Sequence, residues 1–134
     1  MRTLAKVAAL PVLFALAFAA FAYASQHFAG YLFPRVVPRP YLEMMSAAFV
    51  GSVAAALVSS WPLVRLYAGR AWLAALCIAA PVVVIRISDL LHYAGKSEPR
   101  IIVMSWFELI VYPAAILVGV WLVSRLALRG ESAA

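Results

Sequence analysis

Charged residues are scarce in this chain. Of its 134 residues only 12% are charged and 67% are hydrophobic, and the mean hydropathy is +1.00. Soluble domains average about 45–50% apolar and about 25% charged residues, so this composition excludes a separate soluble domain. It predicts an all-α integral membrane protein in which residues 1–134 form a single membrane domain.

Cysteine is nearly absent, since Cys77 is the only one. A single cysteine excludes an internal disulfide, a zinc site and a Cys-x-x-Cys redox pair, and its apolar neighbours in the sequence predict a buried thiol. The sequence also lacks the HExxH, GxSxG, P-loop and dinucleotide-binding patterns. We therefore predict a protein that is not an enzyme and that has neither a metal site nor a cofactor.

Acidic residues are few as well, with five against eleven lysines and arginines, which gives a net charge of +6. Such an excess can indicate nucleic-acid binding, but the basic residues here are scattered singly, without a polybasic run. In a membrane chain, basic residues of this kind flank the spanning helices and determine topology. The prediction is a protein of the lipid bilayer with no nucleic-acid partner.

Long runs of apolar residues predict the helices. A membrane-spanning helix needs about 20 apolar residues, because the hydrocarbon core is about 30 Å thick. Four segments meet this requirement, at about residues 4–24, 42–66, 71–93 and 101–125. The links after the second and third segments are short, which favours antiparallel neighbours. The predicted fold is a four-transmembrane-helix antiparallel bundle.

The N-terminal segment has a second interpretation. MRTLAK, a long apolar stretch and AYA before Ser25 together resemble a secretory signal peptide with an A-x-A cleavage site. The apolar stretch has 18 residues, which exceeds the usual ~7–15 of a signal core and favours a retained first helix. Residues 25–40 contain three prolines and are not expected to form a regular helix.

The basic residues also predict the orientation. With four helices, six basic residues fall on the side of the two termini and four on the opposite side. Lysine and arginine are enriched on the cytoplasmic side, so both termini are expected in the cytoplasm, in a multi-pass protein of the cell (inner) membrane. The side of the termini holds Arg2, Lys6, Arg65, Arg70, Arg125 and Arg129, and the other side holds Arg35, Arg39, Lys96 and Arg100.

The stretch RISDLLH, residues 86–92, interrupts this apolar pattern. It follows an uncharged run that begins at Ala71 and stops at Ile85 after 15 residues, too few to span the hydrocarbon. A charge near the middle of a membrane costs at least about 2.5–3.5 kcal/mol on insertion scales. The charged side chains of this stretch are therefore expected to be paired.

Counting along the two helices identifies the partners. Arg86 lies about 22 Å into its helix and Glu108 about 10 Å into the next one, which places both at a similar depth if the helices are antiparallel. Asp89 is three residues after Arg86, on the same helix face. We predict an intramembrane polar cluster of Arg86, Asp89 and Glu108, with His92 and Glu43 toward the same surface.

Small residues form a second pattern, on the helix expected at residues 42–66. One row recurs every four residues, and a parallel row lies one position later. Small residues at this spacing allow close approach of two helix backbones, so the first row is predicted to be a helix-packing seam. The helix that packs against it can belong to this chain or to another chain. The first row is Ala47, Gly51, Ala55 and Ser59, and the second is Ala48, Ser52, Ala56 and Ser60.

Two classes of function fit these features. The first is an interaction protein that binds a membrane-protein partner or a second copy of itself, as an accessory or assembly subunit or as an immunity protein against a membrane-active toxin. The second is a small oligomeric transporter or channel with Glu108 as the titrating carboxylate and Arg86 as the residue that tunes it. The polar cluster can also serve only to hold two helices in register. Water access to Glu108 separates these hypotheses.

Overall fold

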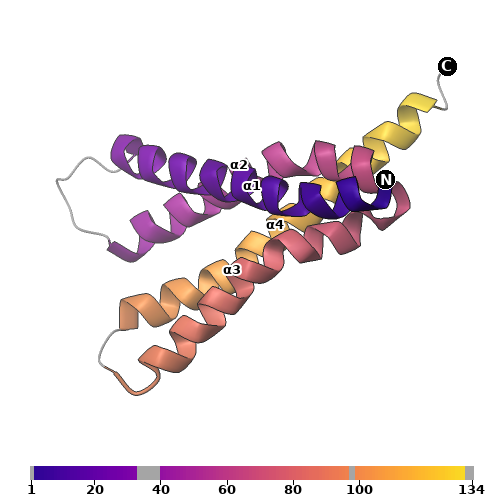
Figure 1. The fold of residues 1–134 in the computed structure, drawn as a ribbon. Helices are drawn as coiled ribbons and strands as arrows, with labels where there is room; N and C mark the ends of the chain where they lie inside the picture. The colour runs from indigo at the N-terminus through magenta and orange to yellow at the C-terminus, as the bar shows by residue number, and fades with distance from the viewer. Residues whose placement is uncertain (1, 33–39, 97–98, 132–134) are drawn as a thin grey trace.

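The computed structural model describes the backbone of residues 2–32, 40–96 and 99–131. Within these ranges the chain forms four α-helices and no strand (Figure 1). They are α1 (Arg2–Leu32), α2 (Pro40–Tyr67), α3 (Ala71–Tyr93) and α4 (Pro99–Glu131). The prediction of an all-α protein is confirmed.

Three continuous helical stretches are long and apolar enough to cross a membrane: Ala5–Phe28, Tyr41–Tyr93 and Pro99–Ala127. The second has 53 residues, because the short 3₁₀ helix η1 (Ala68–Arg70) joins α2 to α3 without an extended loop. These stretches suggest a membrane protein. They number three rather than four. The helical and apolar character of the predicted bundle is therefore confirmed, but its number of four membrane spans is not.

The ends of α1 differ from the prediction. The helix continues to Leu32 instead of ending at residue 24. An interior proline kinks or breaks a helix near its own position and disfavours helical structure at the residue before, but no proline occurs between residues 25 and 32. The expectation of irregular structure from residue 25 onward is therefore wrong as far as Leu32, and residues 33–39 lie outside the described part of the chain.

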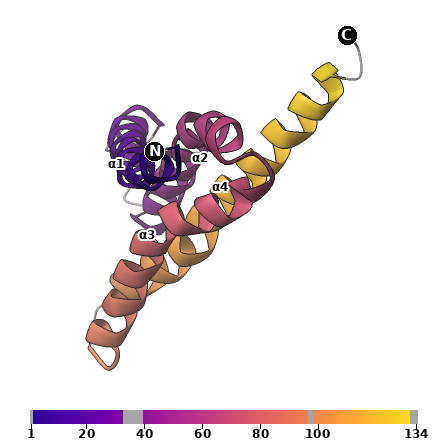
Figure 2. The same cartoon turned by 45° about the vertical axis from the view of Figure 1, so that its right-hand side comes forward.

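α2 and α4 each begin at a proline, Pro40 and Pro99. Proline is favoured in the first turn of a helix, because the N–H that it lacks would have no intrahelical partner there. The chain reverses between α2 and α3 at η1 (Figures 1 and 2). Ala68 adopts a positive φ of 43° at this reversal, a conformation that is uncommon outside glycine.

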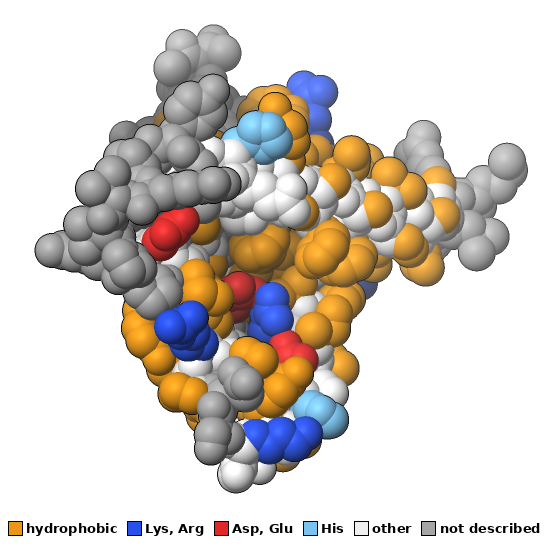
Figure 3. Space-filling view, turned by 90° about the vertical axis from the view of Figure 1, so that its left-hand side faces the viewer, with side chains coloured by type: hydrophobic (Ala, Val, Ile, Leu, Met, Phe, Trp, Pro, Cys, Tyr) orange, Lys and Arg blue, Asp and Glu red, His pale blue; other side chains and the backbone are white. Residues whose placement is uncertain are grey.

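The helices pack in a definite order. α2 lies against both α1 and α4, and α3 lies mainly against α4, with much less contact to α1 and α2. Near the N-terminus and η1 the two helix pairs lie close together, and α4 continues past them toward the C-terminus (Figures 1 and 2). Toward the opposite end the α1–α2 pair and the α3–α4 pair diverge (Figure 1), and the space-filling view of that end shows a hollow between them (Figure 3).

The two rows of small residues on α2 serve two different neighbours, and all eight residues are buried. At Gly51 the backbone of α1 comes so close that a Cβ atom would lie 2.8 Å from the Phe21 carbonyl oxygen. On the other row, a Cβ atom on Gly119 of α4 would collide with the Ser60 hydroxyl. The first row therefore faces α1 and the second faces α4, both within this chain.

α3 buries only one face. Its buried residues are Ala71, Ala74, Ala75, Ile78, Ala79 and Val82. Cys77 lies off this face and its thiol is exposed, so the prediction of a buried thiol is wrong. Helical geometry explains the error, because an apolar stretch in sequence still points its side chains around the whole circumference of the helix.

Candidate functional site

An ion pair joins α3 to α4. The Arg86 Nε donates a hydrogen bond to Glu108 Oε2 at 2.7 Å, and one terminal guanidinium nitrogen lies 2.5 Å from the same oxygen. The Glu108 side chain is only 10% exposed. Burial removes water from the Glu108 carboxylate, so it depends on Arg86 for its hydrogen bonds among the described residues.

Asp89 shares the same guanidinium. The second terminal nitrogen of Arg86 donates to Asp89 Oδ2 at 2.8 Å, across one turn of α3. With one cation and two carboxylates, the cluster has a formal charge of −1. Arg86 contacts a single oxygen of each carboxylate, and no other described residue donates a hydrogen bond to Glu108 or Asp89. Each carboxylate thus keeps one oxygen without a hydrogen bond from the described residues.

The polar cluster, which we define as Arg86, Asp89 and Glu108, is only partly buried. The side chains of Arg86 and Asp89 are 29% and 30% exposed. Figure 3 shows acidic and basic side chains together in the hollow between the two helix pairs. The arrangement can accept a hydrogen-bond donor or a positive group from outside the chain.

His92 and Glu43, the other two residues expected near this surface, are not brought into contact with the cluster. His92 is exposed, and its Nε2 lies 3.0 Å from Lys96 Nζ on the same helix end. Glu43 is half-buried in the first turn of α2, where a negative charge is favourable at a helix N-terminus. Among the described residues neither forms an ion pair, and Arg35 and Arg39, which the topology argument placed on this side, lie outside them.

Sequence reasoning missed Tyr112. It is fully buried on α4, four residues after Glu108, and its ring meets that of Phe21 edge-on with centroids 5.6 Å apart. Its hydroxyl has no hydrogen-bond partner among the described residues. The signal that could have identified it is its spacing, because residues four apart share a helix face. Through Phe21, Tyr112 connects the face of α4 that carries the cluster to the close contact of α1 with Gly51.

The described residues contain no group of three or more His, Cys, Asp or Glu side chains that could hold a metal ion. The packing seam, Ala47, Gly51, Ala55 and Ser59, is buried against α1 and is not an outward surface. The polar cluster, in contrast, joins two helices and leaves part of Arg86 and Asp89 exposed, so it can meet another molecule.

Comparisons with models of protein families, with curated proteins and with solved structures found no match to this chain.

Proposed function

We propose that this chain is a small multi-pass protein of the cell (inner) membrane that acts by helix–helix interaction with a partner membrane protein, as an accessory or assembly subunit or an immunity-type protein. The observation that carries the proposal is the polar cluster. It joins two apolar helices and has a formal charge of −1, and the side chains of Arg86 and Asp89 are 29% and 30% exposed.

The proposed arrangement has four spans. A straight helix of 53 residues would be about 80 Å long, more than twice the hydrocarbon thickness of about 30 Å. The reversal at η1 instead divides this stretch into two antiparallel spans, α2 and α3. Together with α1 and α4 they form a four-helix membrane bundle whose termini share one side, which the basic residues assign to the cytoplasm.

A partner would complete the polar cluster. Charged side chains within a membrane face the bundle interior, water or another chain, because exposure to lipid is costly. Arg86 and Asp89 are nearly one-third exposed, so their outer sides need such a contact. A partner helix that presents a lysine, an arginine or a hydroxyl group to the two available carboxylate oxygens would supply it. Polar residues of this kind hold membrane helices together.

Site-specific photo-cross-linking tests this proposal with neighbouring positions. Leu90 lies one turn after Arg86 and is half-buried, whereas Leu91 points outward and is 75% exposed. A cross-linker at residue 90 should capture one discrete membrane protein, and Asp89→Asn should reduce that product several-fold. The same cross-linker at residue 91 is the control for lipid exposure at equal depth. Equal products from both positions, or products unaffected by Asp89→Asn, would contradict the proposal.

The transporter hypothesis keeps one supporting observation. Glu108 is a mostly buried carboxylate, and the side chain of its partner Arg86 is 29% exposed, so the pair can be reached from outside the described part of the chain. Alternating access would require a second, opposite opening to the same carboxylate. Proton flux into liposomes that contain the purified protein, lost in Glu108→Gln, would favour this second function over the first.

A further inference from the structure

Ser105 lies on the face of α4 that carries the polar cluster. It is three residues before Glu108, and residues three apart share a helix face. The contact of Arg86 with Glu108 fixes the register of the two antiparallel helices, so counting three residues toward their link reaches Asp89 on α3 and Ser105 on α4 at the same depth. Only 1% of Ser105 is exposed, which places a hydroxyl group inside the molecule beside the cluster.

The Ser105 hydroxyl differs from those of the buried serines on α2. Ser52 and Ser60 each donate to the carbonyl four residues earlier, but Ser105 forms no hydrogen bond with any described residue. Among the described residues, the Tyr112 hydroxyl is the one side-chain nitrogen or oxygen that is both completely buried and without a partner. The Ser105 Oγ atom therefore retains some accessible surface and can bond to a group from outside the chain.

Two carboxylate oxygens beside Ser105 are in the same state. Arg86 contacts Oε2 of Glu108 and Oδ2 of Asp89, and the other oxygen of each carboxylate has no hydrogen bond from the described residues. Neither of these oxygens is completely buried, so they too can be reached from outside. With Ser105 Oγ they provide three hydrogen-bond acceptors in a site whose formal charge is −1. This arrangement suits a positive group that has several N–H donors.

A second copy of this chain does not offer such a group at the depth of the cluster. Lys96 belongs to the link between α3 and α4, and Arg100 belongs to the first turn of α4. Two copies facing each other at this site would also bring together two clusters of the same charge, which is unfavourable. Arg86 is the only lysine or arginine that lies away from the helix ends, in residues 7–28, 41–64, 71–93 and 101–124.

Lysine suits the three acceptors better than arginine does. The guanidinium group of arginine is strongest when it pairs with both oxygens of one carboxylate, but Arg86 already contacts one oxygen of each. An ammonium group is a compact charge with three N–H donors, which equals the number of free acceptors. Asp89 is about 6 Å from the end of α3 at Tyr93, so the ammonium group must reach below the surface of the bilayer, as the side chain of a membrane helix does.

We infer that the polar cluster and Ser105 bind the ammonium group of a lysine in a transmembrane helix of a different protein. The occupied site contains two cations and two carboxylates, so its formal charge is zero, which lowers the cost of placing these charges within the membrane. The inference rests on the partner interaction proposed above and names the chemistry of that partner. It excludes a second copy of the chain as the occupant.

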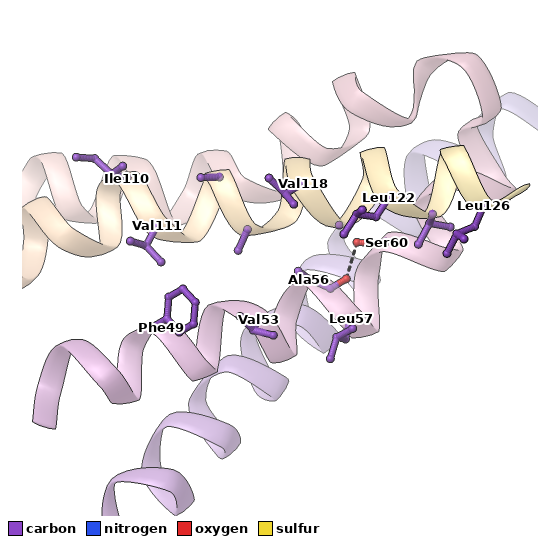
Figure 4. Close-up of a pocket in the computed structure, with 14 residues that line it drawn as sticks. Phe49, Val53, Ala56, Leu57, Ser60, Ile110, Val111, Val118, Leu122 and Leu126 are labelled. Atoms are coloured by element: carbon purple, nitrogen blue, oxygen red, sulfur yellow. Dashed lines mark hydrogen bonds between the residues drawn. The ribbon is translucent and has the colours of Figure 1, made fainter. Parts of the chain in front are cut away.

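An apolar groove between α2 and α4 differs from this site in its chemistry (Figure 4). Its volume is about 640 Å³, and neither Ser105 nor any residue of the polar cluster lines it. Its one polar side chain, Ser60, donates to the Ala56 carbonyl at 2.5 Å, so the groove offers no group that distinguishes a lysine from an apolar side chain. Ala114 lines the groove and is exposed, which makes it a suitable control position.

Binding of synthetic transmembrane peptides in liposomes tests the inference. The full-length protein carries a donor fluorophore on Cys77, its single and exposed cysteine, and an alanine–leucine helix carries the acceptor. A peptide with one lysine about 6 Å below its end should bind about 10-fold more tightly than the same peptide with norleucine, because close charge pairs couple by at least that factor. Peptides with arginine or glutamate at that position should bind more weakly than the lysine peptide.

Variants of the protein assign the effect to the site. Asp89→Asn should reduce binding of the lysine peptide nearly to that of the norleucine peptide, and Ser105→Ala should reduce it about threefold, through loss of one hydrogen bond. Glu43→Gln removes a carboxylate of α2 outside the cluster and should leave binding unchanged, as should Ala114→Phe. Melting temperatures in mild detergent show that each variant is folded.

Several results would overturn the inference. They are equal binding of the lysine and norleucine peptides, stronger binding of the arginine peptide, displacement by excess n-butylamine, and unchanged binding by both Asp89→Asn and Ser105→Ala. Energy transfer between two labelled copies of the protein that Asp89→Asn abolishes would identify a second copy as the occupant and would also overturn it.

Failure of the inference is distinguishable from failure of the proposed function. A discrete protein captured by the cross-linker at residue 90 that has no lysine at this depth would refute the inference and leave the proposed function standing. Selective binding of the lysine peptide, without any discrete cross-linked protein in cells, would support the inference about the site and contradict the proposed function.

Discussion

Arg86 of α3 directs two nitrogens of its guanidinium to a single oxygen of Glu108 on α4, at 2.7 and 2.5 Å. The third nitrogen reaches Asp89. Such a pair is weak evidence of net stabilisation, because desolvation of both charges opposes their attraction. Removal of one partner is nevertheless destabilising, because it leaves the other charge unpaired in an apolar site. This asymmetry makes the pair open to a direct test.

A double-mutant cycle measures the coupling. Arg86→Leu and Glu108→Leu should each lower the free energy of unfolding, and the double variant should recover much of the loss. Breaking a buried pair costs about 3–5 kcal/mol, but Arg86 is 29% exposed, so we expect about 1–3 kcal/mol for each single variant. Thermal denaturation in mild detergent provides the measurement. Additive losses in the double variant would show that the two residues do not interact.

Asp89 needs its own cycle, because it can hold Arg86 without Glu108. Asp89→Asn keeps the shape of the side chain and removes its charge. We expect a smaller loss than for Glu108→Leu, since Asp89 is 30% exposed and Glu108 is 10% exposed and solvent screens the more exposed pair. Melting temperatures of the two single variants, compared in the same detergent, decide the order. A larger loss for Asp89→Asn would identify Asp89 as the principal partner.

Gly51 should tolerate no side chain. A Cβ atom there would lie 2.8 Å from both the ring and the carbonyl oxygen of Phe21, and the carbonyl can move away only if α1 moves. Overpacking of this kind costs about 1–3 kcal/mol, so Gly51→Ala should lower the melting temperature and Gly51→Leu should abolish folding. Gly69→Ala is the matched control, because nothing lies within 4 Å of its added Cβ. Equal stability of the two alanine variants would refute the close approach of α1 and α2.

Tyr112→Phe should leave the stability of the protein unchanged or raise it. The variant keeps the ring that packs on Phe21 and removes a buried hydroxyl without a partner in the described structure. A buried polar group that forms no hydrogen bond costs about 1–3 kcal/mol, so a gain of about 1 kcal/mol is expected from thermal denaturation. A clear loss would mean that the hydroxyl is bonded in the membrane, by water or by a partner.

The predicted topology can be tested with reporter fusions. A reporter after Ser124 and one inserted within residues 96–99 should lie on opposite sides of the membrane, with the former in the cytoplasm. The expectation follows from the six basic residues on the side of the termini against four on the other. A periplasmic reporter after Ser124 would reverse the orientation and move Arg65 and Arg125 to the outer leaflet.

Residue counting could already place Arg86 level with Glu108, because every helical residue advances by about 1.5 Å and the short link between α3 and α4 makes them antiparallel. The same reasoning could not place His92 and Glu43. Both were assigned by depth alone, and depth does not specify the direction of a side chain around the helix axis. In the structure His92 lies beside Lys96 and Glu43 lies in the first turn of α2.

The sequence by itself determined the helical, apolar character of the chain and the approximate bounds of its helices, since hydropathy and length are local properties. Only the tertiary structure decided which neighbour each row of α2 meets, that Tyr112 packs on Phe21, and that the helix pairs diverge around a hollow. These features depend on the rotation and crossing of whole helices. Many residues distant in sequence set that geometry together, and an apolar pattern without a polar stripe is compatible with several helix rotations.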